Sequence, residues 1–153
     1  MRLSAGAVTT VHIALGVLAL ALNAVAALYG GWCWWQVRTS AWFWRILRAG
    51  QAAVVLEAAI GGIMQLGRHK APGIHILYGL LPLAVAFVAE QLRLASAQMV
   101  LDGRGFESAA EVGQLPEEEQ RGVVVAILQR ETGVMALAAV VIVVLLARAA
   151  GTY

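Results

Sequence analysis

The chain has 153 residues, of which 61% are hydrophobic and only 13% are charged. Because a water-soluble domain carries about 25% charged residues, this composition excludes a soluble globule and a disordered chain and indicates one integral membrane domain over residues 1–153. The net charge of +2 gives no indication of a nucleic-acid partner. The single cysteine, Cys33, excludes an intramolecular disulfide and a cysteine-rich metal site.

Four apolar stretches reach or approach the ~20 residues that span a bilayer as an α-helix. They cover roughly 8–30, 49–67, 73–92 and 132–147. With their flanks, the expected helices run over about 8–37, 40–67, 73–101 and 116–149. The third should stop near Asp102 and Gly103, and the fourth should start at Pro116, with three glutamates at the positive end of its dipole. We therefore predict an all-α fold, an up-down bundle of four transmembrane helices with cytoplasmic helical overhangs.

The basic residues are divided unevenly between the two ends of this predicted bundle. One end carries Arg2, Arg68, Lys70 and Arg148. The other carries Arg38, Arg45, Arg48, Arg93, Arg104, Arg121 and Arg130. Since the end richer in Lys and Arg faces the cytoplasm, both termini and the 68–72 connection are expected outside. The preference for arginine over lysine is typical of a GC-rich bacterial genome, so we expect a multi-pass protein of a bacterial inner membrane.

All five tryptophans surround the first connection between helices, at Trp32, Trp34, Trp35, Trp42 and Trp44. The indole ring is apolar but its N–H needs a polar partner, which favours the headgroup level of a membrane. The cluster therefore predicts an interfacial belt, with stacking on a substrate as the alternative.

The first three helices each carry a stripe of small and polar residues on one face. On the first helix it comprises His12, Gly16, Ala19, Asn23 and Gly30. On the second it comprises Gly50, Ala53, Glu57, Gly61, Met64 and Arg68. On the third it comprises His75, Gly79, Pro82, Ala86 and Arg93. Small residues allow close approach and polar ones avoid lipid, so the stripes should face the interior. The fourth helix has no such stripe and is expected to be a wall of the bundle rather than a contributor of chemistry.

His12 and His75 lie close to the same end of two parallel helices and therefore at nearly equal depth. In an up-down bundle these helices are diagonal neighbours, with axes roughly 11–14 Å apart. Such a gap suits two imidazoles that reach one haem iron from opposite sides. We therefore predict that His12 and His75 are metal ligands in a haem site, although a purely structural role for both remains open.

Other residues near this end could complete a haem site. The candidates that would make room for the flat ring are Gly16, Gly61 and Gly79. The candidates that would pair with the propionates are Arg68 and Lys70. Alternative ligands are Met64 and His69.

Glu57 is expected near mid-membrane on the second helix, with Asn23 at a similar depth on the first. A carboxyl group inside a membrane is costly, which makes it a candidate for binding a quinone or carrying a proton. The alternative is a protonated Glu57 that joins the two helices through a hydrogen bond to Asn23.

A family pattern accompanies these residues. A helix with His12 is followed by a helix with Gln51 and then Gly61-Gly62, an outer loop, and a helix that opens with His75. Over residues 8–95 this arrangement resembles the His-paired four-helix units of heme A synthase halves and of small b-type cytochromes of the cytochrome b561 class. The resemblance implies that the two histidines hold a haem b. The glutamate-histidine-arginine motif of heme A synthase is absent around His12, so the resemblance does not extend to that enzyme's activity.

The sequence thus predicts a membrane-embedded b-type haem protein acting in electron transfer or haem handling. Its expected partners are the lipid bilayer, a quinone or a redox partner protein, and a second copy of the chain. The alternatives are a non-catalytic accessory or assembly subunit and a small oligomeric transporter that uses Glu57 and Asn23. The sequence contains no phosphate-binding loop, nucleophile elbow or zinc-protease motif, and enzymatic activity stays open.

Overall fold

The structure, a computed structural model, describes residues 5–67 and 71–152. These contain the helices α1 (Ala5–Trp35), α2 (Ala41–Leu66), α3 (Gly73–Gly103), α4 (Ala109–Val112) and α5 (Glu117–Ala150), and no strand. The predicted all-α class is confirmed. All helices but α4 are long and apolar enough to cross a membrane. The short α4, which the apolar pattern did not reveal, lies in the connection between α3 and α5.

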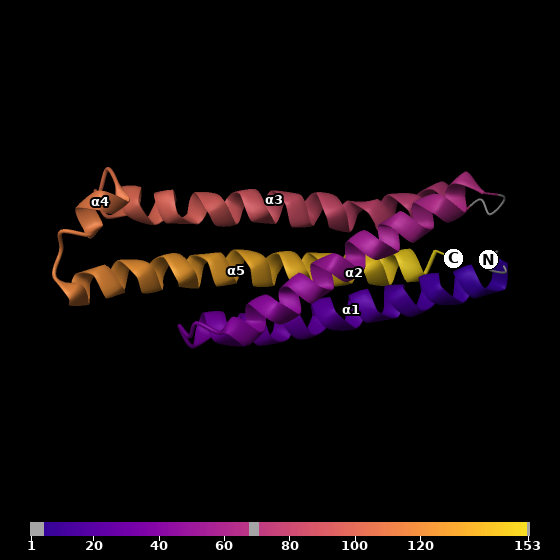
Figure 1. Cartoon of the computed structure of the whole chain (residues 1–153), viewed down its shortest axis with the longest axis horizontal. Coiled ribbons are helices and arrows are strands. Elements are labelled where there is room, and N and C mark those ends of the chain that lie inside the picture. Colours follow the sequence, from indigo (N-terminus) through magenta and orange to yellow (C-terminus); the bar gives the residue numbers. More distant parts are fainter. Residues whose placement is uncertain (1–4, 68–70, 153) are drawn as a thin grey trace.

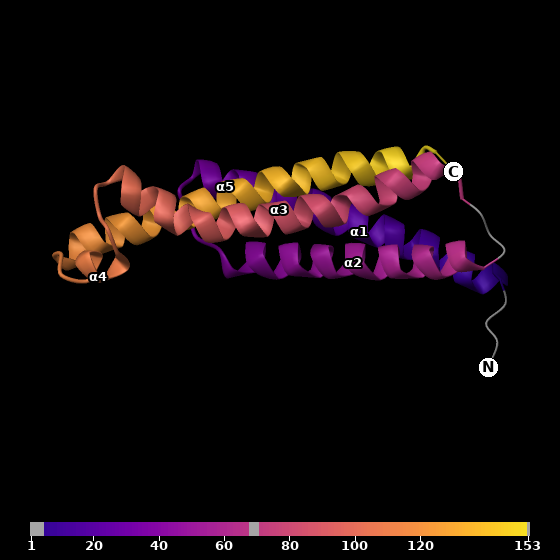
Figure 2. The ribbon, with the colours of Figure 1, turned by 90° about the horizontal axis from the view of Figure 1, so that it is seen from above.

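The long helices alternate in direction along the molecule (Figure 1). The start of α1, the start of α3 and the end of α5 lie at one end, here called the histidine end. At the other end α3 and α5 extend beyond the α1–α2 connection and carry α4 (Figures 1 and 2). α5 packs along both α1 and α3, α1 also packs along α2, and α2 touches α3 at few places.

The interior is built largely from small side chains on α5. Ala139 and Met135 of α5 are fully buried, and they belong to one core cluster with Ala26 of α1 and Phe43 of α2. Alanines let helix axes approach closely where lipid is the solvent. The fourth long helix was expected to be a wall rather than a contributor of chemistry. Alanine packing, which needs no polar stripe, makes α5 the helix against which both α1 and α3 pack.

α1 and α2 fit together through glycines that alternate between the two helices. A Cβ added at these glycines would come within 3.3 Å of a side chain of the other helix. The pairs, glycine first, are Gly61 with His12, Gly16 with Glu57, Gly50 with Asn23 and Gly30 with Phe43. From one pair to the next, the residue number on α1 increases by as much as the residue number on α2 decreases. This is the register of two antiparallel helices. Each glycine therefore provides the space that a larger side chain of the partner helix fills.

α1 ends in a Schellman motif in which Val37 occupies the position that glycine usually takes. The Arg38 N–H donates to the Cys33 carbonyl at 2.9 Å, and the Val37 N–H donates to the Trp34 carbonyl at 3.2 Å. Val37 has a φ of 52°, a left-handed conformation that is strained for a β-branched residue. This turn directs the chain toward Ser40, whose side chain caps α2 by accepting from the Phe43 N–H.

We expect Val37→Gly to increase the free energy of unfolding by about 1 kcal/mol. The strain of a residue such as valine at positive φ, of order 1–3 kcal/mol, exceeds the added chain entropy of glycine, roughly 0.5–1 kcal/mol. Val37→Ala keeps a Cβ and should gain less. Thermal unfolding of the three proteins in the same detergent measures the difference, and a Val37→Gly protein no more stable than the wild type would contradict the strain.

Candidate functional site

His12 and His75 come together at the histidine end, from α1 and α3. Their ring centroids are 6.2 Å apart, and the ring planes are inclined by 66°. Both side chains are partly buried, and His12 is only 14% exposed. Two imidazoles from helices that are distant in sequence thus form a pair within the apolar part of the chain.

Each ring has an oxygen acceptor from another helix beside its Nδ1 atom. His75 Nδ1 lies 3.0 Å from the Ala149 carbonyl oxygen of α5, which can only accept, so this nitrogen carries the proton and donates. His12 Nδ1 lies 3.1 Å from Glu57 Oε1 of α2, an approach within ion-pair distance but without the alignment of a hydrogen bond. The two rings are therefore oriented through the same nitrogen.

Glu57 faces His12 and Gly16, and the alternative hydrogen bond between Glu57 and Asn23 is not formed. Glu57 Oε2 and Asn23 Oδ1 are both buried without a hydrogen-bond partner in the described part of the chain. The Asn23 amide instead donates to the Ala19 carbonyl at 2.8 Å, within its own helix. The α1–α2 register places Asn23 beside Gly50, two helical turns away from Glu57.

The glycines predicted to make room for a haem ring differ in their surroundings. The space at Gly16 is filled by the Glu57 carboxyl group, and that at Gly61 by the His12 ring. Gly79 has no atom within 4 Å of an added Cβ, so it leaves an open surface on α3. Two of the three glycines therefore accommodate side chains of the site itself.

Several other predicted residues lie around or outside this group. Arg68, His69 and Lys70 fall outside the described residues. Met64 is partly buried on α2. Arg148 precedes Ala149 in the chain, and its guanidinium carbon lies 5.7 Å from the centre of the Tyr78 ring. The role of Ala149 was missed, because it acts through its backbone and the sequence pattern carries no signal for it.

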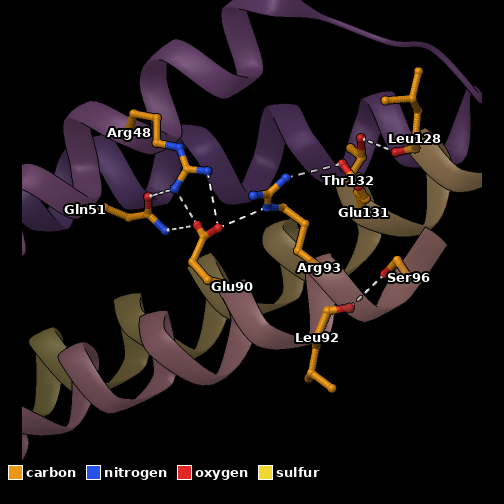
Figure 3. A network of polar contacts seen from close by, with 9 residues as sticks. All are labelled: Arg48, Gln51, Glu90, Leu92, Arg93, Ser96, Leu128, Glu131 and Thr132. Atoms are coloured by element: carbon orange, nitrogen blue, oxygen red, sulfur yellow. Dashed lines mark hydrogen bonds and ion pairs between the residues drawn. The ribbon is translucent and has the colours of Figure 1, made fainter. Parts of the chain in front are cut away.

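A second polar cluster ties α2, α3 and α5 together farther along the molecule (Figure 3). Glu90 accepts from Arg48, from Gln51 at 3.1 Å and from Arg93 at 2.9 Å. Arg93 also lies 3.7 Å from Glu131 of α5. The Glu90–Arg93 pair lies within α3, three residues apart, whereas the links to Arg48 and Glu131 depend on the helix arrangement. With two arginines and two glutamates the cluster is neutral, as a structural clamp between helices should be.

In the described residues no group of three or more His, Cys, Asp or Glu side chains is arranged to hold a bare metal ion. A haem iron needs at most two protein ligands, because the porphyrin supplies the other four. No family model, curated protein or solved structure matches this chain.

We expect Glu57→Leu to lower the free energy of unfolding by roughly 1–2 kcal/mol, the scale of polar contacts between membrane helices. Leucine leaves the buried His12 Nδ1 without its carboxyl partner. Glu57→Gln keeps an oxygen at that position and should fold with nearly wild-type stability. Equilibrium unfolding of both variants in detergent checks the difference, and equal losses for Leu and Gln would contradict the contact with His12.

Proposed function

We propose that this chain is a membrane-embedded b-type haem protein in which His12 and His75 are the axial ligands of one haem, acting in electron transfer or haem handling. The observation that carries the proposal is the ring pair itself, with a centroid separation of 6.2 Å. Metal–nitrogen bonds of histidine are about 2 Å long, and a ring nitrogen lies about 1 Å from its ring centre. Two imidazoles on opposite sides of one iron therefore have centroids about 6 Å apart.

The partners of the two Nδ1 atoms support the same assignment. A histidine that binds a metal through Nε2 usually donates its other N–H to a carboxylate or a backbone carbonyl, which fixes the orientation of the ring. The Ala149 carbonyl accepts from His75 in this way, and the Glu57 carboxyl group lies 3.1 Å from Nδ1 of His12 without the alignment of a hydrogen bond. The donor set and its supporting shell therefore fit an axial histidine pair.

A bound haem b would supply one-electron chemistry, and the chain would supply ligands, orientation and charge. We propose Arg68, Lys70 and the described Arg148 as the cations for the propionates, since charged hydrogen bonds to carboxylates are the strong ones. Gly79, with its open surface, is the proposed point of contact with the ring edge. A quinone or a redox protein would exchange electrons with the haem, and a second copy of the chain is a further expected partner.

The proposal places the four long helices as an up-down bundle across a bacterial inner membrane. The histidine end with both termini faces outward, and the extended α3–α5 end with α4 forms a cytoplasmic overhang. The distribution of arginine between the two ends supports this orientation.

The absorption spectrum of the purified protein, expressed with ample haem, tests the proposal. We expect a Soret band and visible bands that sharpen on reduction, as for a low-spin iron with two histidine ligands. A colourless but folded protein would refute haem binding. It would leave the accessory subunit and the transporter around Glu57 as the functions to examine.

Cysteine labelling in intact cells tests the proposed orientation. Cys33 is buried, with 1% of its surface exposed, and its removal by Cys33→Ala provides a background without thiols. In that background we expect Ala71→Cys to react with an impermeant thiol reagent and Ser108→Cys to be protected until the cells are opened. The reverse pattern would invert the orientation without changing the number of spanning helices.

A further inference from the structure

The connection between α1 and α2 carries positive charge that no acidic side chain balances. The first acidic residue of the whole sequence is Glu57. Arg38 lies in this connection and Arg45 lies in the second turn of α2. Both are exposed, and neither makes an ion pair in the part of the chain that the structure describes. Arg48, one turn farther along α2, is engaged by Glu90.

Each of these two arginines lies over a tryptophan ring. The Arg38 guanidinium carbon is 5.1 Å from the centre of the Trp32 ring, and that of Arg45 is 5.0 Å from the centre of the Trp42 ring. A guanidinium that lies over an indole is attracted to the face of the ring and still has N–H donors that match the oxygens of a phosphate. The side chain is also held in place before a ligand binds, so less entropy is lost on binding.

The surface beside the arginines is apolar and uncovered. Trp42 is 64% exposed and Trp32 is 44% exposed. On α1, Leu28 and Val25 continue the exposed face of Trp32 at helical spacing, with 77% and 50% of their surfaces exposed. An anion that bears a long hydrocarbon chain would therefore find cationic donors and an apolar track next to each other.

We propose that the α1–α2 connection is a binding site for anionic phospholipids, in which Arg38 on Trp32 and Arg45 on Trp42 each bind a headgroup phosphate. The apolar track along α1 favours a phospholipid over a free phosphate ion. The unbalanced charge selects an anionic headgroup over a zwitterionic one, whose own cation the arginines repel. This site is separate from the histidine end and does not depend on haem.

The fluorescence of the tryptophans in this site can report lipid binding directly. In phosphatidylcholine vesicles, brominated lipids quench tryptophans that they touch, so quenching gives the relative binding constant of phosphatidylglycerol against phosphatidylcholine. For the wild type we expect this ratio to be about 5 or more, the effect of one arginine near an anionic lipid. For Arg38→Gln/Arg45→Gln we expect it to fall to about 1 with the helical content unchanged. If the double variant does not fold, each single variant should show a partial loss.

Two control variants, and addition of inorganic phosphate to the wild type, separate a phospholipid site at these arginines from general electrostatic attraction. Arg104→Gln/Arg121→Gln removes the same charge from the α4 end of the molecule and should keep the wild-type ratio. Arg38→Lys/Arg45→Lys keeps the charge without the planar guanidinium and should give an intermediate ratio. A ratio near 1 for the wild type would overturn the proposal. So would a wild-type ratio for the lysine variant, or abolition of the preference by inorganic phosphate.

Discussion

His12→Ala and His75→Ala should each abolish the low-spin haem spectrum of the purified protein. In the proposed haem site, alanine would remove one of the two nitrogens that would hold the iron, so the bands that sharpen on reduction should disappear. His69→Ala should retain them, because His69 is not one of the two rings that form the pair at 6.2 Å. Spectra of oxidised and reduced protein, with haem content measured alongside, provide the comparison.

Substitutions of Glu57 should lower haem affinity without removing either histidine. Loss of a group that orients a metal-bound histidine typically lowers affinity 10–100-fold, so Glu57→Leu should lower haem affinity by about 10-fold or more while His12 remains. Glu57→Gln should retain most of it. A double His12→Ala/His75→Ala protein that still carries low-spin haem would move the ligands elsewhere, and Met64 would be the first residue to test.

Gly30→Ala should destabilise the fold by about 3 kcal/mol, the upper range for overpacking a tight core. An added Cβ would lie 2.8 Å from Cδ2 of Phe43 and 3.0 Å from the Ala136 Cβ. The Phe43 ring is 1% exposed and cannot swing aside. The substitution therefore forces α1 away from α2 and α5 at once.

The neighbouring glycine provides a matched control for this prediction. Gly31 has no atom within 4 Å of an added Cβ, so Gly31→Ala should gain about 1 kcal/mol from helix propensity alone. Equilibrium unfolding of both variants under one condition measures the contrast. Equal behaviour of the two would mean that α1 and α2 do not pack in the register described.

The two glycines also show where sequence reasoning reaches its limit. The apolar stretch over 8–30 and its flank predict that Gly30 and Gly31 lie in a helix. The helical spacing from Gly16 and Asn23 predicts that Gly30 faces the interior. Which side chain fills each glycine depends on the register between α1 and α2. That register is set by the simultaneous fit of Phe43, Asn23, Glu57 and His12, and no periodicity within one helix contains it.

The sequence by itself determined the helical class and the approximate bounds of the four long helices, because a bilayer requires about 20 apolar residues per crossing. It also selected His12, His75 and Glu57, since polar groups in apolar helices are too costly to occur without a partner. Only the tertiary structure decided which groups these three side chains contact. Helix packing places the Glu57 carboxyl group beside His12 and not beside Asn23. It also places the Ala149 carbonyl oxygen beside His75. It also made α5 the central support, since contacts of alanines and backbone carbonyls depend on helix placement and leave no polar pattern along the chain.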